Sequence, residues 1–521
     1  MKRHHVLLIP GDGIGQIIVP EAARVVDAVG EVEGFSIDYE HADMGGVAYD
    51  KATADMNEHL KKGIDKWSDE EKEKLSLPQR TIEAMDRARD RKGAILFGAV
   101  GRPDLPKRVA ELALLAMRKR YGLNNKRPFE IDAALAHNSI LFREPVYVPG
   151  FTLVRTEESL FTGEHGGDED HTWTRKPFTL SKLEKTVKNA FEQAKREGKK
   201  ILCVSKYNVL LSEQVLSDVF ERYAREYAGQ VEFNEFSQDG QLIIDNAGMQ
   251  LAANPKRYAN TVVVADAMFG DFLQAIMDVV TGGKAVNKAA LAEIKQNGLY
   301  RMFIRELCGG LYFGERKRTP EHVYDTMEYD RKTIEAIAKM AKEDSARLKS
   351  GSIDSLEIEE VPSFDFWARV LSEHSKKHGY TLRHYDVKGA VEQLLTNPSS
   401  FGTLIASNMM GDIFTDLAAA VVGKSLGMMA SSEVNEENFG NYQQIAGSAP
   451  GRKEPNPIAE IRSAAMMLED FGYPEAAQRI YGGIRRVLSV ARTEDIHEPG
   501  YKLVGTREMT DRIIEAARSN N

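Results

Sequence analysis

Cysteine is scarce in this sequence, which has only two, Cys203 and Cys308, among 521 residues. Two cysteines form neither a disulfide framework nor a thiolate metal site, and they suit a reducing compartment. Positive charge is not in excess either, because the formal net charge is −9. A protein without a basic field has no general attraction for nucleic acids or anionic membranes, so neither is expected as a partner.

Long apolar runs are also missing. No stretch approaches the roughly 18 apolar residues that a membrane span requires. The first apolar run stops at the Pro-Gly-Asp of residues 10–12, which is too short for a signal peptide. The composition is otherwise ordinary, with 42% hydrophobic and 28% charged residues. We therefore expect a soluble, cytoplasmic protein that is long enough for two or more domains.

The N-terminal part has the pattern of an α/β protein. Residues 4–29 predict a buried strand, a Gly-rich turn and an amphipathic helix. Residues 91–103 predict a second buried strand that ends in a Gly/Pro loop, and residues 111–128 predict a helix that leads into a turn. Residues 165–171 ("HGGDEDH") have the residue types of a metal cluster, but this Gly-rich acidic run is expected to be a mobile loop.

The middle of the chain repeats itself. Residues 245–271 resemble residues 386–412, and both ends of the match are 141 positions apart. Further upstream, "LVRTEESLFTGE" (153–164) resembles "FIRELCGGLYFGE" (303–315). The repeated unit is about as long as a domain, so the pattern indicates a duplicated α/β lobe rather than a solenoid.

Two copies of one helix start carry the first candidate chemistry. In "NMMGDIFTDLAAAVVG" (408–423), Asp412 and Asp416 stand four residues apart and would share a helix face. Carboxylate oxygens suit hard divalent cations. The earlier copy, "AMFGDFLQAIMDVVTG", has Asp271 and Ala275 at these positions. Asp271 is therefore either a remnant of the metal site or only a helix cap.

Several motifs together resemble one family. They are "GDGIG" (11–15), "LFGAVGRP" (96–103), "LLAMRKRYGLNNKRP" (114–128), "KYNVL" (206–210), "GDIFTD" (411–416) and "GSAP…NP" (447–457). In this order they resemble the isopropylmalate/isocitrate dehydrogenase family. The resemblance implies a metal-dependent β-decarboxylating dehydrogenase that uses NAD or NADP and Mg²⁺ or Mn²⁺.

The resemblance also implies an α/β, isocitrate/isopropylmalate dehydrogenase-like two-lobed fold with a duplicated small α/β lobe. The large lobe would combine residues 1–125 and 401–521 from the two chain ends. Residues 126–290 would form small-lobe copy one, and residues 291–400 would form copy two.

By resemblance, Arg118, Arg127 and either Arg305 or Arg155 would hold substrate carboxylates. Lys206 and Tyr312 would be the catalytic Lys and Tyr. In copy one the Tyr position is Phe161, and in copy two the Lys position is taken by Ser355. The metal ligands would be Asp245, Asp412 and Asp416, while the roles of Asp271 and Asp386 are left open.

Family homodimers build each site with a Lys and one metal Asp from the neighbouring subunit. Lys206 and Asp245 of copy one would play the neighbour's part for the residues of copy two. The opposite combination has Phe161, Ser355 and Ala275 and is incomplete. The hypothesis is that each chain holds one competent site, so the protein would be either a monomeric pseudo-dimer or a homodimer.

The cofactor segment departs from the family pattern. In "AGSAPGRKEPNP" (446–457), Ala446 replaces the usual His and no Asp is available for a ribose diol. Arg452 and Lys453 would suit a 2′-phosphate, which favours NADP slightly, but a solvated basic turn is the alternative. Gly447, Ser448, Asn456 and the more distant Glu111 complete the predicted cofactor contacts. Glu111 would lie near the nicotinamide, or act only on the dipole of its helix.

The substrate predicted from these motifs is a 3-substituted malate that is similar to isopropylmalate. Leu112, Leu114 and Leu115 would suit an alkyl group, although they would serve equally as core residues. Isocitrate, homoisocitrate and tartrate-type substrates remain alternatives, as does redox chemistry without decarboxylation. A non-catalytic regulatory subunit of the same family is the alternative from another class.

Overall fold

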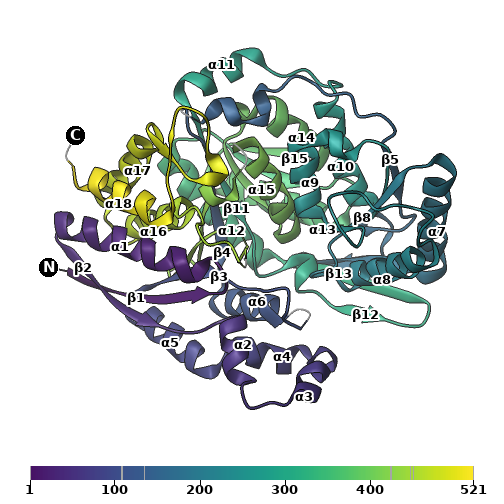
Figure 1. The fold of residues 1–521 in the computed structure, drawn as a ribbon, viewed down its shortest axis with the longest axis horizontal. Coiled ribbons are helices and arrows are strands. Elements are labelled where there is room, and N and C mark those ends of the chain that lie inside the picture. The colour runs from purple at the N-terminus through teal and green to yellow at the C-terminus, as the bar shows by residue number, and fades with distance from the viewer. Residues whose placement is uncertain are drawn as a thin grey trace. The chain divides into compact units, whose positions relative to one another are not determined.

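The computed structural model describes residues 2–106, 109–133, 135–422, 425–445, 447–449 and 451–519. The chain forms two compact units, whose elements can be followed by colour in Figure 1. Unit 1 consists of residues 1–128 and 424–521, and unit 2 of residues 129–423. The division into four segments stays a prediction. Among the described helices, none combines the length and apolar character that a membrane span requires.

Unit 1 is built on a mixed sheet with the strand order β4-β17-β18-β3-β1-β2. Strand β1 pairs in parallel with β2 and β3, and β3 pairs in parallel with β18, whereas β17 runs antiparallel to both β18 and β4. The apolar run 6–9 of β1 is buried, as expected for a strand covered on both faces. The strands are β1 (Lys2–Gly11), β2 (Phe35–His41), β3 (Ala94–Ala99), β4 (Asn124–Ile131), β17 (Ala430–Val434) and β18 (Gly440–Gln444), with a separate pair, β19 (Ala491–Arg492) and β20 (Lys502–Leu503).

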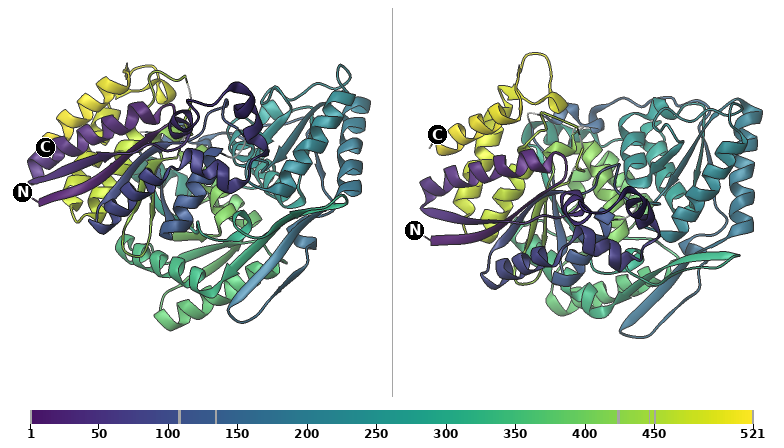
Figure 2. Two further views of the ribbon diagram at one scale, coloured as in Figure 1. Left: turned by 90° about the horizontal axis from the view of Figure 1, so that it is seen from below. Right: turned by 60° about the horizontal axis from the view of Figure 1, so that its bottom comes forward.

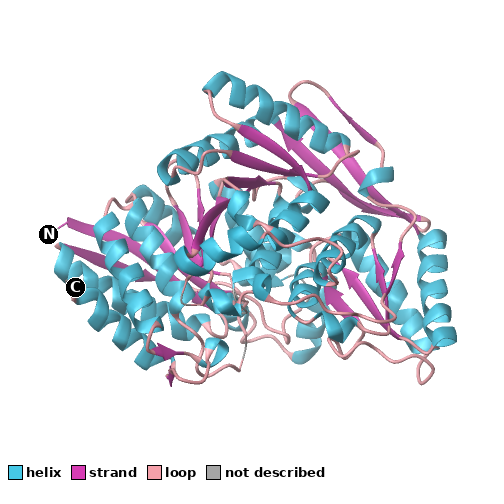
Figure 3. Cartoon of the chain, turned by 90° about the horizontal axis from the view of Figure 1, so that it is seen from above, coloured by secondary structure: helices cyan, strands magenta, loops and turns pink. Residues whose placement is uncertain are grey.

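Helices flank the strands of unit 1 (Figure 3). Their bounds are α1 (Gly15–Glu33), α2 (Gly46–Ala52), α3 (Glu58–Gly63), α4 (Asp69–Ser76), α5 (Gln79–Asp90), α6 (Val109–Tyr121), α16 (Ile458–Asp470), α17 (Pro474–Leu488) and α18 (Thr506–Arg518). Met117 of α6 packs with Ile9 and Phe97 in one core cluster. Of the three leucines, Leu112 is buried, whereas Leu114 and Leu115 are half-buried. The predicted turn follows α6 at Gly122, and strand β4 begins soon after it, where "NNKRPFEI" pairs with β17.

Unit 2 contains the same series of elements twice. Its two parallel sheets have equivalent strand orders, β5-β10-β8-β9 and β11-β16-β14-β15. The internal duplication predicted from the sequence is therefore confirmed. Copy one comprises β5 (Thr152–Arg155), β6 (His165–Gly167), β7 (His171–Thr179), α7 (Leu180–Glu197), β8 (Lys200–Ser205), α8 (Leu211–Glu226), β9 (Gln241–Ile243), α9 (Ile244–Ala253), β10 (Thr261–Ala265) and α10 (Ala267–Val280). Helix α11 (Lys288–Asn297) follows, and copy two comprises β11 (Leu299–Arg305), β12 (Arg316–Arg318), β13 (His322–Asp330), α12 (Arg331–Leu348), β14 (Ile353–Glu357), α13 (Pro362–His378), β15 (Leu382–Asp386), α14 (Val387–Thr396), β16 (Thr403–Ala406) and α15 (Asn408–Val422).

The two copies join through one four-stranded sheet with the order β12-β13-β7-β6. Strands β7 and β13 are antiparallel, and His171 lies beside Asp330 while Thr179 lies beside His322. The first residue of each strand thus faces the last residue of the other, which is the register of a local two-fold axis. These hairpins are blue and teal in Figure 2.

Residues 165–167 form β6 and residue 171 begins β7, so only residues 168–170 of the expected loop lie outside the strands. Gly166 pairs with Trp173, and the backbone carbonyl of His171 accepts from the amide of Asp168 at 2.8 Å. Alternate residues of β7 are buried, and this half-buried strand holds the loop in place.

The helices of unit 2 pack across the two copies. Helix α15 of copy two packs on α9 of copy one, and α10 of copy one packs on α14 of copy two (Figure 1). Each Gly-Asp helix therefore contacts the other copy, as the equivalent surfaces of a symmetric dimer would.

Copy one contains a buried charge cluster at a strand position where copy two has an apolar residue. Lys176 on β7 lies 2.5 Å from Glu213 and 3.3 Å from Asp266, and all three side chains are fully buried. The equivalent sixth residue of β13 is Met327. Burial, together with Asp266, raises the pKa of Glu213 to about 7 against the opposing effect of Lys176. The ammonium of Lys176 is thus required to compensate two buried carboxylates.

We expect Lys176→Met to lower the free energy of unfolding by about 3–5 kcal/mol, because it leaves Glu213 and Asp266 without their cation. The matched control is Lys182→Met, which removes a half-exposed partner of Glu158 and should leave the free energy of unfolding nearly unchanged. Urea unfolding at neutral pH measures both values. Equal effects would show that the buried carboxylates do not depend on Lys176.

Candidate active site

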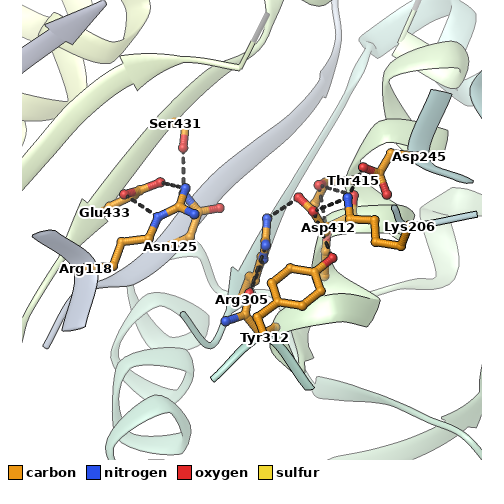
Figure 4. Close-up of polar contacts among 12 residues, drawn as sticks. Arg118, Asn125, Lys206, Asp245, Arg305, Tyr312, Asp412, Thr415, Ser431 and Glu433 are labelled. Atoms are coloured by element: carbon orange, nitrogen blue, oxygen red, sulfur yellow. Dashed lines mark hydrogen bonds and ion pairs between the residues drawn. The ribbon is translucent and has the colours of Figure 1, made fainter. Parts of the chain in front are cut away.

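Asp412, in the first turns of α15, is the centre of a charged cluster in unit 2 (Figure 4). Its Oδ1 accepts from Arg305, and its Oδ2 accepts from Tyr312 at 3.2 Å and from Lys206 at 2.9 Å. Lys206 also donates to Asp245. The structure therefore brings together five predicted site residues, three from copy two and two from copy one.

A glycine allows Arg305 to lie across the start of α15. A Cβ placed on Gly411 would be 2.5 Å from Cγ of Arg305, so a larger residue would displace that side chain. Asn408 Oδ1 then accepts from Arg305 Nη2 at 2.8 Å and fixes the guanidinium. The same Gly-Asp pair occurs in copy one, where a Cβ on Gly270 would be 2.9 Å from Cγ of Arg155.

Lys206 follows the last residue of β8 and is almost completely buried. Its backbone amide donates to Glu213 Oε2 at 3.3 Å, which links the residue to the buried cluster of Lys176. Burial alone would lower the pKa of Lys206, but the neighbouring carboxylates of Asp245 and Asp412 raise it well above the usual value. Lys206 is therefore an ammonium that bridges two carboxylates.

Burial also changes the two other titrating groups. It raises the pKa of Tyr312 well above its usual value, although Lys206 acts in the opposite direction. Burial raises the pKa of Asp245, and repulsion by Asp412 adds to this effect while Lys206 opposes it. Asp245 Oδ1 is buried and accepts no hydrogen bond from any described residue. Two carboxylates on one cation, with one buried oxygen left over, form a donor set that fits a hard divalent cation.

The third predicted metal ligand is placed differently. Asp416 is half-buried and lies one turn after Asp412 on α15. Within the described ranges, no three His, Cys, Asp or Glu side chains form a group that could hold a metal ion. The structure thus gathers Asp245 and Asp412, and the role of Asp416 stays a prediction.

Unit 1 has a separate buried ion pair (Figure 4). Arg118 on α6 donates to both oxygens of Glu433, from Nε at 3.1 Å and from Nη2 at 2.6 Å. Asn441 and Gln443 of β18 donate to the same carboxylate at 3.1 and 2.7 Å. Arg127, on the neighbouring strand β4, is also buried. Sequence reasoning missed Glu433, although a lone Glu within the buried strand 430–434 is a signal for a buried partner.

Three predicted cofactor residues line one cavity of about 440 Å³ in unit 1. Glu111, Gly447 and Ser448 share it with the loop 100–103 that follows β3. Ser448 Oγ donates to the carbonyl of Gly101, and its own carbonyl accepts from the amide of Ile14 at 2.7 Å. The motif "GDGIG" and the segment 447–449 are thereby joined.

The second residue of that motif, Asp12, is a positioning residue that the sequence reasoning did not single out. Its buried carboxylate accepts from the amides of Gly101 and Gly46 at 2.8 Å and from that of Val47 at 3.0 Å. One side chain therefore fixes the loop after β3 and the start of α2.

The remaining predicted cofactor residues do not line this cavity. Arg452 and Lys453 are exposed. Asn456 is buried. Its side-chain amide accepts from the backbone amide of Ile458 at 3.0 Å, at the start of α16, and donates to Asp495 at 3.1 Å. Ala446 lies outside the described residues.

Strand register corrects the predicted counterpart of Lys206. Ala265 and Ala406 end the equivalent strands β10 and β16, and they pair with Val204 and Leu356. The residue two positions further is Lys206 in copy one and Ile358 in copy two. Ser355 was therefore the wrong counterpart; it is a buried residue within β14 that accepts from Trp367 Nε1 at 3.1 Å.

Asp271 is not a helix cap. Asp266 is the N-cap of α10 and accepts from the amide of Met268 at 2.9 Å. Asp271 lies one turn further along, where it pairs with Arg155 and, at 3.1 Å, with Lys388. The two arginines that competed for one role thus have separate partners, Asp271 for Arg155 and Asp412 for Arg305.

Comparisons with known proteins show the family of the chain. The sequence model of the isocitrate/isopropylmalate dehydrogenase family matches twice, over residues 67–300 and 284–513. The 3-isopropylmalate dehydrogenase of Aliivibrio fischeri is 40% identical over 43% of this chain, and the match spans 64% of that enzyme's length. The 3-isopropylmalate dehydrogenase 2 of Dechloromonas aromatica is 28% identical over 98% of both chains.

A solved structure supports the same fold. The isocitrate dehydrogenase of Methylococcus capsulatus has a TM-score of 0.55 and 18% identity, and the similarity covers 99% of this chain and 100% of that one. The α/β fold class with an internal duplication is therefore confirmed. The twofold match of the family model, in a chain whose unit 2 repeats one set of elements, identifies the protein as a member of the isocitrate/isopropylmalate dehydrogenase family.

Proposed function

We propose that the chain catalyses the NAD(P)- and Mg²⁺- or Mn²⁺-dependent oxidative decarboxylation of a 3-substituted malate. The observation that carries this proposal is the convergence of Lys206, Tyr312 and Arg305 on Asp412. A guanidinium, an ammonium and a phenol around one carboxylate supply charge complementarity and two proton-transfer groups. Family membership and the names of the relatives support the same reaction class.

Each residue of the cluster has a chemical task in this proposal. Arg305, with Arg118 and Arg127, would hold the substrate carboxylates through charge-assisted hydrogen bonds. Lys206 would accept the proton of the substrate hydroxyl. Burial lowers the pKa of a lysine, so Lys206 becomes a base once the charge of Asp245 and Asp412 is compensated. Tyr312 has a pKa above its usual value, so it keeps its proton and can donate it to carbon after CO₂ leaves.

The metal would be held by Asp245 and Asp412, with Asp416 as a further predicted ligand. When bound, it supplies positive charge beside the oxygen that becomes an enolate. The buried, unpartnered Oδ1 of Asp245 supports this placement. The dinucleotide would occupy the cavity of Glu111, Gly447 and Ser448, and Arg452 and Lys453 favour NADP.

The substrate would be similar to isopropylmalate, with isocitrate, homoisocitrate or a tartrate-type acid as alternatives. A regulatory subunit without turnover is favoured by one specific observation, the bidentate pairing of Arg118 with Glu433 in place of a ligand. A panel of 2-hydroxy acids with each nucleotide and Mn²⁺, assayed for CO₂ and reduced cofactor, separates these proposals. Ligand binding without turnover would favour the regulatory subunit.

Small-molecule substrates, rather than nucleic acid or membranes, are the partners in this proposal. A monomeric pseudo-dimer is supported by the two-fold register of β7 and β13 within one chain, while a homodimer of such chains is the alternative. A cytoplasmic location remains part of the proposal, and it agrees with two cysteines that form no disulfide.

We expect Lys206→Ala and Tyr312→Phe each to lower kcat by roughly 10²–10⁴-fold, because each removes one proton-transfer group. The matched control is Asp271→Ala, at the position equivalent to Asp412, which should leave turnover near the parent value. Steady-state assays with the best substrate of the panel measure these effects. Full activity in Lys206→Ala would overturn the assignment of the site.

The double substitution Arg452→Ala/Lys453→Ala tests the nucleotide. If these cations meet a 2′-phosphate, KM for NADP should rise at least about tenfold while KM for NAD stays unchanged, since charge-assisted hydrogen bonds contribute about 1.5–3 kcal/mol. Lys502→Ala, which removes a half-exposed lysine paired with Glu508, is the surface control. An equal change for both nucleotides would reject the 2′-phosphate contact.

A further inference from the structure

The arrangement around Asp412 is partly repeated at the start of α10. The residues from the helix's own copy are equivalent, whereas those from the other copy differ. Arg155 pairs with Ala265 in the sheet, as Arg305 pairs with Ala406, so the two arginines are equivalent. Arg155 binds Asp271, as Arg305 binds Asp412. The difference lies in the residues that the other copy contributes.

The other copy contributes a lysine where the active cluster has an aspartate. Helices α9 and α14 both have ten residues, Ile244–Ala253 and Val387–Thr396, and both end at an Asn-Pro pair. Their second residues are Asp245 and Lys388. Asp245 faces Lys206 beside Asp412, whereas Lys388 places its ammonium 3.1 Å from Asp271 Oδ2.

Asp386, the counterpart of Asp245 in the sequence alignment, has moved to another task. It is the N-cap of α14, where it accepts from the amide of Lys388 at 3.0 Å and from the amide of Glu359 at 3.3 Å. The constant spacing of 141 positions is therefore interrupted here: the helix α14 begins two residues late relative to α9. The carboxylate of Asp386 therefore binds backbone amides instead of a cation.

The electrostatics of the second cluster oppose a divalent ion. Ala275, buried in α10, replaces Asp416, and Ile358 replaces Lys206. One carboxylate, Asp271, remains between two cationic side chains, Arg155 and Lys388. A divalent ion there would lack two carboxylate ligands and would lie beside two positive charges.

We propose that the ammonium of Lys388 takes the place of a metal ion in a second, lost site, so that each chain binds a single divalent cation. The Lys388–Asp271 pair then holds α14 of copy two against α10 of copy one without any metal. This inference rests on one part of the proposed function, namely that a divalent cation binds at Asp245 and Asp412.

Counting bound Mn²⁺ tests the inference without an activity assay. The full chain is titrated with Mn²⁺ alone, and free Mn²⁺ is measured by electron paramagnetic resonance. We expect one ion per chain in the parent and in Asp271→Asn, and none in Asp412→Asn. No bound ion in the parent would overturn the metal in the proposed function. Two ions in the parent, or a loss of binding in Asp271→Asn with Asp412→Asn unaffected, would overturn only the present inference.

The reverse experiment restores the missing carboxylates. The double variant Lys388→Asp/Ala275→Asp should bind a second Mn²⁺, while Lys388→Gln, which removes the ammonium without adding a ligand, should still bind one. Two ions bound to Lys388→Gln would show that a second site does not need the lost carboxylates. One ion bound to the folded double variant would show that Lys388 does not take the place of a metal ion. Circular dichroism verifies the fold, and the titrations of the parent and Asp271→Asn decide the matter if the double variant does not fold.

Discussion

The charged cluster of unit 2 depends on the hydrogen bonds and ion pairs of the Asp412 carboxylate. This carboxylate receives Arg305 and Tyr312 from its own copy and Lys206 from the other, and Lys206 carries the contact on to Asp245. Lys206, Arg305 and Tyr312 are buried, so removing the carboxylate of Asp412 would leave uncompensated charge in a poorly solvated place. These bonds therefore connect copy one with copy two, in addition to the pairing of β7 with β13.

The backbone of the duplicated unit has kept its symmetry while its side chains have not. Strands β7 and β13 pair about a local two-fold axis, and each copy caps a helix of the other. Asp325 accepts from the amide of Ser212 at 2.7 Å at the start of α8, and Thr174 accepts from the amide of Ser363 at 3.2 Å at the start of α13. Backbone pairing tolerates substitution, because the hydrogen bonds do not depend on side-chain identity. A cluster of charged side chains has no such tolerance, and the other copy contributes different residues to Asp412 and to Asp271.

Several site features could be read from the sequence because local patterns determine them. The Gly-Asp helix starts and the order of the motifs predicted Lys206, Arg305, Tyr312 and Asp412 as neighbours. Other features depend on register and could not be read. Ser355 was assigned by counting along a divergent segment, whereas the strand register makes Ile358 the residue equivalent to Lys206. Asp12 and the ion pair of Glu433 were missed, since the amides that Asp12 binds lie 34 to 89 positions away in sequence and Arg118 lies 315 positions from Glu433.

The sequence by itself determined the family, the α/β class, the duplication and the residue types of one complete site, because these depend on motifs and on a repeat that alignment can detect. Only the tertiary structure decided how individual carboxylates are used. Whether a carboxylate caps its own helix, as Asp386 does, or reaches across to another copy, as Asp245 does, depends on where the helix begins relative to its strand. With a shift of two residues at the start of α14, Asp386, whose role the sequence left open, is a cap, and the ammonium of Lys388 lies beside Asp271.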